Sequence, residues 1–316
     1  MSDPAPEKIL QHPRFLLMIK RFSFLLLAFF LLFTQLVWGE EPFAFVVVGD
    51  AGCGCKEQIA VAQRMIEWHK EKPYHYVLMT GDNIYGEDFF RKSFSVRKRG
   101  GDPGLFASRF DSVYGRLLGK GVKFLASLGN HDVETKDGRY EIKDKKRFNI
   151  LGDKGYYVTK PESQKEDLIT FFALNSTRFM KEEDDEQVQW LSRELAASQS
   201  KWKIVFFHHP IYTPPGKHEP EALFLKAIEN ILVAGGVKIT FAGHNHFYAR
   251  IKPQKGITHF VSGGGGRYLK TPEKSTITEV TAKAYHFLYV EIYPDRIDFW
   301  AIPPTGPPLD QGTIRQ

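Results

Sequence analysis

The apolar run FAFVVV, residues 43–48, ends abruptly in Gly49-Asp50. Six consecutive apolar residues followed by a glycine and a carboxylate are typical of a strand buried on both faces. The same pattern, an apolar run that ends in Gly or His and polar residues, recurs at residues 76–80, 122–128, 204–207 and 237–241. Apolar residues at helical spacing lie between these runs, as in residues 56–70. Alternating strands and helices predict an α/β fold.

Local signals predict four further features. Acidic residues at 184–186 precede an apolar pattern and suit the first turn of a helix. Residues 219–233 form another helical pattern, and residues 285–302 alternate as a hairpin does. Residues 87–121 are the longest stretch without a clear strand, and we expect them near the mouth of the site with a short helix at 106–118.

Polar side chains follow each of the five apolar runs. In an α/β fold, ligands bind beyond the carboxyl ends of the strands, so these side chains should meet at one edge. They are Asp50, Asp82, Tyr85, Asn130, His131, His208, His209, His244 and His246. Carboxylates, imidazoles, an amide and a phenol suit iron, manganese or zinc. The set exceeds the needs of one ion, and two ions about 3.5–4 Å apart can clamp both oxygens of a phosphoryl displacement.

Five sequence blocks in a fixed order resemble the signature of the purple acid phosphatases, a branch of the calcineurin-like metallophosphoesterases. The blocks are GDAG at 49–52, GDNIY at 81–85, GNHD at 129–132, VFFH at 205–208 and GHNH at 243–246. Five blocks in order are far more specific than any one of them. General members carry Asp-x-His in the first block, whereas this chain has Asp50-Ala51-Gly52 and gains Tyr85 in the second. The chain is therefore similar to the small, tartrate-resistant-like bacterial type of the purple branch.

The resemblance implies a two-sheet β-sandwich flanked by helices, the αββα fold, with its metal site at the strand C-terminal ends. It implies a ferric ion held by Asp50, Asp82, Tyr85 and His246. It implies a second, divalent ion (iron, zinc or manganese) held by Asp82, Asn130, His208 and His244, with Asp82 as the bridge. A hard phenolate also favours Fe(III). The alternative for Tyr85 is a packed core tyrosine, which leaves a general zinc or manganese phosphoesterase.

The resemblance also implies residues that act on the substrate. His131 directly follows a ligand and is expected to face the substrate phosphate, as a positioner or general acid. Asp132 is expected to orient that imidazole from behind. His218 lies close to where relatives carry another substrate-side histidine, although its spacing from His208 does not decide the matter. His209 is either a partner behind the ligands or a packed histidine at a strand end.

These residues predict an acid phosphatase, a hydrolase that cleaves phosphate monoesters by attack of a metal-bound hydroxide. A phosphodiesterase or nucleotidase on the same site is one alternative. An exported iron-binding protein with incidental activity is another, although a carrier does not need substrate-facing residues. The chain has 43 Lys and Arg against 37 Asp and Glu, a mildly basic balance that suits an anionic substrate. A nucleic-acid-binding domain is not expected, because such domains concentrate their basic residues on one face.

The N-terminus resembles a targeting segment. Lys20 and Arg21 precede an uncharged apolar run at 22–38, as in a signal peptide. The run is also near the lower limit for a membrane span, so an uncleaved anchor stays an alternative. Residues 1–39 are therefore predicted as a signal peptide or signal anchor, with Met18 as an alternative start. Residues 40–316 are predicted as a single catalytic domain that is exported, periplasmic or extracellular, and attached to a membrane only by residues 22–38.

Three local features are open to two interpretations. The basic cluster at 97–99, followed by two glycines, is a solvated loop or a patch that attracts phosphate. Cys53 and Cys55 are separated by one residue, so a bridge would close a tiny ring, and we expect free thiols. The glycine run at 263–266 before Arg267 resembles a loop seen in bacterial members, where the backbone can approach the site, or it is a flexible turn.

Overall fold

A computed structural model of the chain describes residues 41–87, 98–162, 164, 167–180, 184–215 and 222–316. The chain divides into two compact units, residues 1–42 and residues 43–316, and the fold below is that of the second unit. The predicted targeting segment at 1–39, the candidate His218 and Arg97 of the basic cluster lie outside the described residues. Within the described ranges, no helix is long and apolar enough to cross a membrane.

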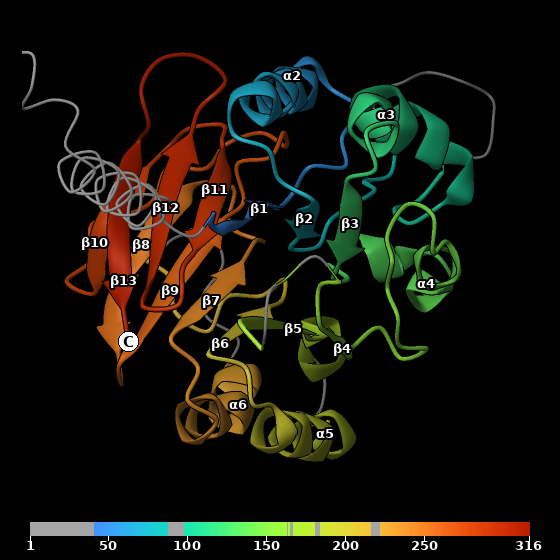
Figure 1. Cartoon of the computed structure of the whole chain (residues 1–316). Helices are drawn as coiled ribbons and strands as arrows, with labels where there is room; N and C mark the ends of the chain where they lie inside the picture. Colours follow the sequence, from blue (N-terminus) through green and yellow to red (C-terminus); the bar gives the residue numbers. More distant parts are fainter. Residues whose placement is uncertain (1–40, 88–97, 163, 165–166, 181–183, 216–221) are drawn as a thin grey trace, which may run out of the picture. The chain divides into compact units, whose positions relative to one another are not determined.

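Two β-sheets form the centre of this unit (Figure 1). The first sheet has the order β13 (Asp310–Arg315), β12 (Arg296–Ile302), β11 (Phe287–Ile292), β1 (Phe43–Val48), β2 (Tyr76–Met79) and β3 (Lys123–Ala126). The second has the order β10 (Thr278–Ala282), β8 (Tyr248–Gln254), β9 (Ile257–Ser262), β7 (Ile239–Ala242), β6 (Trp202–Phe206), β5 (Ile169–Ala173) and β4 (Tyr157–Thr159). Strands β1, β2 and β3 are parallel, as are β5, β6, β7 and β9. Each sheet thus has a parallel part whose carboxyl ends can carry a site.

The two sheets pack face to face through aromatic side chains. The Phe45 ring of β1 lies 5.2 Å from the Phe171 ring of β5 and 6.0 Å from the Phe241 ring of β7, edge to face in both cases. All three rings are fully buried. Every residue of β1 is buried, as the uninterrupted apolar run 43–48 predicts for a strand with both faces covered.

Helices cover the outer faces of both sheets (Figure 1). On the first sheet, Trp68 of α2 (Lys56–Glu71) packs against Tyr289 of β11, and Tyr114 of α3 (Ser112–Leu118) packs against Phe124 of β3. On the second, α5 (Asp185–Ala197) and α6 (Ala222–Ala234) share a buried cluster with β6. The predicted αββα sandwich is confirmed.

Most predicted elements are present. The acidic start of α5 is capped by Asp184, whose carboxylate accepts a hydrogen bond from the backbone N–H of Gln187. The predicted hairpin is β11 and β12, and β13 extends it. The expected helix at 106–118 consists of a five-residue π-helix (Ala107–Asp111) followed by α3. Short helical turns and α4 (Arg139–Lys143) follow β3.

Candidate metal centre

The five sequence blocks meet where β1, β2, β3, β6 and β7 end. Three of the strand-end residues, Asp50, Asp82 and His244, have positive φ angles of 57°, 52° and 68°. Left-handed backbone of this kind costs about 1–3 kcal/mol per residue outside glycine and is found most often at functional sites. Close packing maintains it: a Cβ on Gly129 would lie 2.3 Å from the Asp82 backbone nitrogen.

A first cluster joins the ends of β1, β2 and β7. The Tyr85 hydroxyl lies 3.1 Å from Asp50 Oδ1 and 3.2 Å from His246 Nε2, and these last two atoms are 3.3 Å apart. Ligand atoms of Asp82 also belong to this group, since Asp50, Asp82 and His246 can direct one atom each to within 4.8 Å of one another. Three donors about 3 Å apart are the spacing expected of neighbouring ligands around one ion with bonds of about 2 Å.

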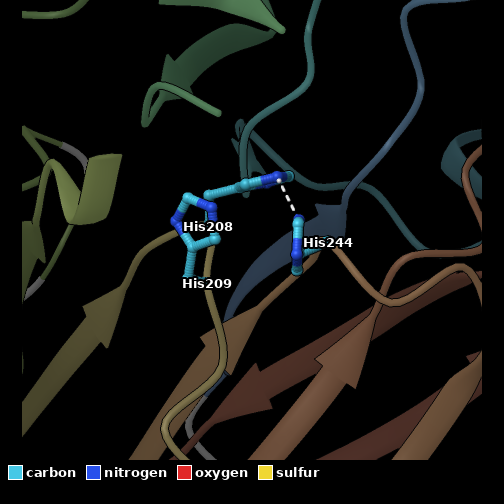
Figure 2. Close-up of side chains that lie close together, drawn as sticks. All are labelled: His208, His209 and His244. Carbon is cyan, nitrogen blue, oxygen red and sulfur yellow. Dashed lines mark hydrogen bonds between the residues drawn. The ribbon is translucent and has the colours of Figure 1, made fainter. Parts of the chain in front are cut away.

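A second cluster contains His208 and His244 (Figure 2). Asn130 Oδ1 lies 3.1 Å from both His208 Nε2 and His244 Nδ1, and these two nitrogens are 3.2 Å apart. Asp82 Oδ1 lies 3.4 Å from His208 Nε2. Asp82 therefore lies between the two clusters and reaches both.

Burial and neighbouring charges shift the pKa values of Asp82 and Tyr85. Burial alone would raise the pKa of Asp82. The nearby His208 and His131 rings and the His131 backbone N–H lower it by more, so the net pKa lies below the ordinary value and the ionised carboxylate is favoured. Burial raises the pKa of Tyr85 well above 10, and the charges of Asp50 and Asp82 raise it further. A cation bound here would compensate the carboxylates and displace the phenol proton, so the donors fit a hard metal ion.

The imidazole rings are oriented by backbone carbonyls. His208 Nδ1 lies 2.9 Å from the Thr80 carbonyl, and His246 Nδ1 lies 2.9 Å from the Tyr268 carbonyl. Each contact fixes the ring so that Nε2 faces its cluster, as partners behind metal ligands commonly do. Neither carbonyl has a sequence signal, because a backbone oxygen is present at every residue.

His209 lies against His244 of the second cluster. It is fully buried, and its ring centre lies 4.5 Å from that of His244 (Figure 2). Its Nδ1 lies 2.9 Å from the Ser176 hydroxyl, which also accepts the His209 backbone N–H at 3.0 Å. A ring nitrogen of His209 also lies within 4.8 Å of ligand nitrogens of His208 and His244, so His209 is itself a candidate ligand as well as a partner of the cluster.

His131 is held by a residue that the sequence did not single out. Its side chain is 37% exposed, its ring lies 4.7 Å from the Tyr85 ring, and its Nδ1 lies 2.6 Å from Glu134 Oε1. Asp132, the expected partner, instead accepts hydrogen bonds from the backbone of Ile84 and Gly129. The expectation that Asp132 orients His131 is therefore wrong. A helical turn places residue i+3 beside residue i, which brings Glu134 to the ring.

Asp132 belongs to a buried acidic group behind the clusters. The Asn83 side-chain amide donates to Asp132 Oδ2 at 3.1 Å and to Glu141 Oε2 at 2.9 Å. Burial and the Asp82 charge raise the pKa of Asp132 to about 6. Burial and the Asp132 charge raise the pKa of Glu141 well above its ordinary value, so its protonated form is favoured.

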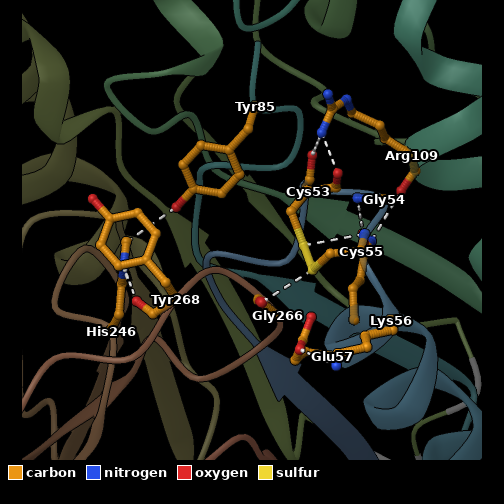
Figure 3. Close-up of a disulfide and its surroundings, with 12 residues drawn as sticks. Cys53, Gly54, Cys55, Lys56, Glu57, Tyr85, Arg109, His246, Gly266 and Tyr268 are labelled. Carbon is orange, nitrogen blue, oxygen red and sulfur yellow. Dashed lines mark hydrogen bonds and ion pairs between the residues drawn. A yellow bond between two sulfur atoms is a disulfide. The ribbon is translucent and has the colours of Figure 1, made fainter. Parts of the chain in front are cut away.

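A disulfide lies in the loop that carries Asp50 (Figure 3). Cys53 and Cys55 are bonded, with their Cα atoms 5.2 Å apart, so the prediction of free thiols is wrong. The left-handed backbone of Gly54, at φ 64°, brings the two Cα atoms within bridging distance. Cys55 Sγ lies 3.2 Å from the Gly266 carbonyl. The bridge thus joins the end of β1 to the glycine run.

The glycine run 263–266 is a packing element. A Cβ on Gly263 would lie 2.2 Å from the Asn245 carbonyl oxygen, and one on Gly265 would lie 2.3 Å from the Gly49 carbonyl oxygen. The Gly265 N–H donates to that Gly49 carbonyl at 2.9 Å. The close-approach interpretation is therefore correct, and the flexible-turn alternative is wrong.

The fold and the paired clusters define a metallophosphoesterase. The sequence profile of the calcineurin-like phosphoesterases matches residues 43–248. Mouse tartrate-resistant acid phosphatase type 5 is 23% identical over 271 residues, covering 74% of this chain and 79% of the mouse protein. Purple acid phosphatase 17 of Arabidopsis thaliana is 25% identical, covering 81% of this chain and 78% of the plant protein.

Solved structures share the fold. A purple acid phosphatase from yellow lupin seeds superposes with a TM-score of 0.68 and 16% identity, covering 88% of this chain and 54% of the lupin chain. A Plasmodium protein described as the anchor in the inner membrane complex superposes at 0.70 with 17% identity, covering 87% and 89%. The chain belongs to the calcineurin-like phosphoesterase family. It is a hydrolase of phosphate esters, related to the tartrate-resistant and purple acid phosphatases.

The raised pKa of Glu141 predicts a pH dependence of stability. A buried acid with a raised pKa contributes stability at pH values below its unfolded pKa, about 4.3, and that contribution is lost as the pH rises toward the folded pKa. Glu141→Gln keeps a similar shape but does not titrate. As the pH rises from the unfolded pKa toward the folded pKa of Glu141, the free energy of unfolding of the variant should therefore fall less than that of the wild type. Urea unfolding across this range measures the difference, with exposed Glu279→Gln as the matched control. Identical pH dependence in wild type and Glu141→Gln would contradict the assignment.

Proposed function

We propose that this chain is an exported acid phosphatase that hydrolyses phosphate monoesters with a ferric ion and a divalent ion. The observation that carries the proposal is the convergence of two donor clusters on one shared carboxylate, Asp82, which lies 3.4 Å from His208 Nε2 and in the same group as Asp50 and His246. When bound, two such ions supply positive charge for the phosphoryl oxygens and lower the pKa of water. The relatedness to purple acid phosphatases supports this pairing of metals.

We assign the residues to the two ions by the types of donor atom in each cluster. Tyr85, Asp50 and His246, together with the shared Asp82, would hold the ferric ion, because a phenol and carboxylates are hard oxygen donors. Asn130, His208, His244 and Asp82 would hold the divalent ion, since an amide and two imidazoles suit iron(II), zinc or manganese. The position of the Tyr85 hydroxyl between Asp50 and His246 supports its assignment as a ligand over the packed-core alternative.

His131 is the side chain suited to proton transfer. It is partly exposed beside Tyr85, and the Glu134 carboxylate holds its Nδ1, so Nε2 is available to donate a proton to the leaving-group oxygen. A general acid must carry its proton to act, which agrees with a phosphatase that works at acid pH. An oriented proton donor beside the ligands favours an enzyme over the alternative of an exported iron-binding protein, because iron binding does not require such a residue. Export rests on residues 1–39 as a signal peptide or anchor.

The metal assignment predicts linked losses of metal and activity. Asp82→Ala removes the shared carboxylate, so the purified variant should lose most of both metals and its activity on 4-nitrophenyl phosphate should fall more than a hundredfold, as expected when a ligand of a catalytic ion is lost. Asn130→Ala should lose mainly the divalent ion. Metal content per chain and phosphate release are measured on the same samples. A fully active Asp82→Ala enzyme would refute the proposed site.

The contact between Glu134 and His131 predicts a separate effect on turnover. Glu134→Gln keeps an acceptor for the Gly100 N–H, which donates to Glu134 Oε2 at 2.9 Å, but removes the carboxylate from His131. We expect kcat to fall about tenfold to a hundredfold while KM and metal content change little, since the imidazole is positioned less well. Asp137→Asn removes an exposed charge from the same segment and is the control. If KM rises while kcat stays constant, Glu134 does not act through His131.

A further inference from the structure

Two cations lie at the rim of the first cluster, on the segment that follows β9. The Arg267 guanidinium carbon lies 4.8 Å from the centre of the Tyr85 ring and 5.1 Å from the centre of the Tyr268 ring. Lys270 Nζ lies 4.4 Å from the centre of the same Tyr268 ring. Tyr268 is 51% exposed, so the two cations flank a ring that is open to solvent.

The segment is fixed to residues of the first cluster by its backbone. The Arg267 N–H donates to the Asp50 carbonyl at 3.1 Å, and the Lys270 N–H donates to the His246 carbonyl at 2.9 Å. Between them, the Tyr268 carbonyl bonds His246 Nδ1 at 2.9 Å, and the two rings lie edge to face at 5.2 Å (Figure 3). Both cations are therefore carried by a backbone of fixed position, beside the residues that would hold the ferric ion.

The chemistry of the rim favours an anionic ligand. Aromatic faces attract cations, so the Tyr268 ring holds Arg267 and Lys270 in place. A guanidinium presents a planar fork of N–H donors that matches two oxygens of a phosphate, and an ammonium adds a point charge. Because Arg267 and Lys270 contact the Tyr268 ring, that ring is less able to stack on an aromatic leaving group. The two cations can instead bind a leaving group that carries negative charge.

We propose that Arg267 and Lys270 form a leaving-group subsite that selects phosphate esters and anhydrides whose leaving group carries a second phosphate. This inference rests on the proposed function. The reaction is hydrolysis: the oxygen of water forms a bond to the terminal phosphorus and gives up a proton. The bond from that phosphorus to the bridging oxygen breaks, and the leaving phosphate retains the bridging oxygen with the electron pair of that bond. The subsite binds this departing phosphate, whereas a neutral alcohol leaving group carries no charge for Arg267 and Lys270 to bind.

A comparison of ADP with AMP tests the subsite on the metal-loaded enzyme. Loss of the terminal phosphate leaves AMP from ADP, which is anionic next to the broken bond, and adenosine from AMP, which is neutral. Arg267→Gln and Lys270→Gln should each lower kcat/KM for ADP about tenfold, the effect of losing one charged hydrogen bond. The value for AMP should change by less than about twofold. Lys274→Gln removes an exposed charge further along the same segment and should leave both values unchanged. Equal losses on both nucleotides, or no loss on ADP, would overturn the proposal.

A binding measurement separates this proposal from the proposed function. Methylenediphosphonate and methylphosphonate are titrated calorimetrically into wild type and Lys270→Gln, with metal content measured afterwards. We expect Lys270→Gln to weaken binding of the diphosphonate about tenfold and to leave the monophosphonate unchanged. If the wild type hydrolyses neither nucleotide nor 4-nitrophenyl phosphate, the proposed function fails, and the titration still decides the subsite. Equal diphosphonate affinity in both proteins would overturn it.

Discussion

The structure depends on one electrostatic constraint: Asp50 and Asp82 are buried next to the Tyr85 hydroxyl, with exposed fractions of 2% or less for all three residues. Burial of ionised carboxylates away from water costs free energy unless nearby positive charge compensates them. Histidines supply part of that charge, and a bound cation would supply the remainder. The local arrangement of the chain, from strand ends to the glycine run, brings these oxygens and nitrogens together.

The scaffold holds this arrangement through its backbone. Left-handed residues at the strand ends cost free energy that the packing of two sheets offsets. Glycines let main chains approach where a Cβ would collide, as at Gly129 against Asp82 and at Gly265 against Gly49. The disulfide and the glycine run meet at Gly266, so loops more than two hundred residues apart in sequence support the same end of β1. Substitution of these glycines should therefore affect the site as well as the fold.

Much of the fold could be predicted from the sequence, because strands buried on both faces are apolar along their whole length. The runs at β1, β2, β3, β6 and β7 gave such a signal, and the polar residues after them identified the edge where the clusters form. Strand β10 alternates between partly buried and exposed residues and was missed. Strands β5 and β9 are fully buried and β8 is partly buried, but none of them is followed by one of the five polar blocks, and they were missed as well. Strand pairing over long distances has no local signal. Side-chain type alone did not decide between Asp132 and Glu134 as the partner of His131. That choice depends on a helical turn after the third block.

We propose that the Tyr85 oxygen is a ligand of a ferric ion, and the visible absorption spectrum of the purified, oxidised, iron-loaded protein distinguishes such a ligand from a packed tyrosine. Tyr85→Phe, which removes only the hydroxyl, is measured beside it with the iron content of both. A broad visible band that disappears in Tyr85→Phe is the predicted result, since a phenolate bound to ferric iron gives the purple branch its colour. A colourless wild type with a full complement of ferric iron would contradict the claim and leave a metallophosphoesterase in which Tyr85 is a packed tyrosine.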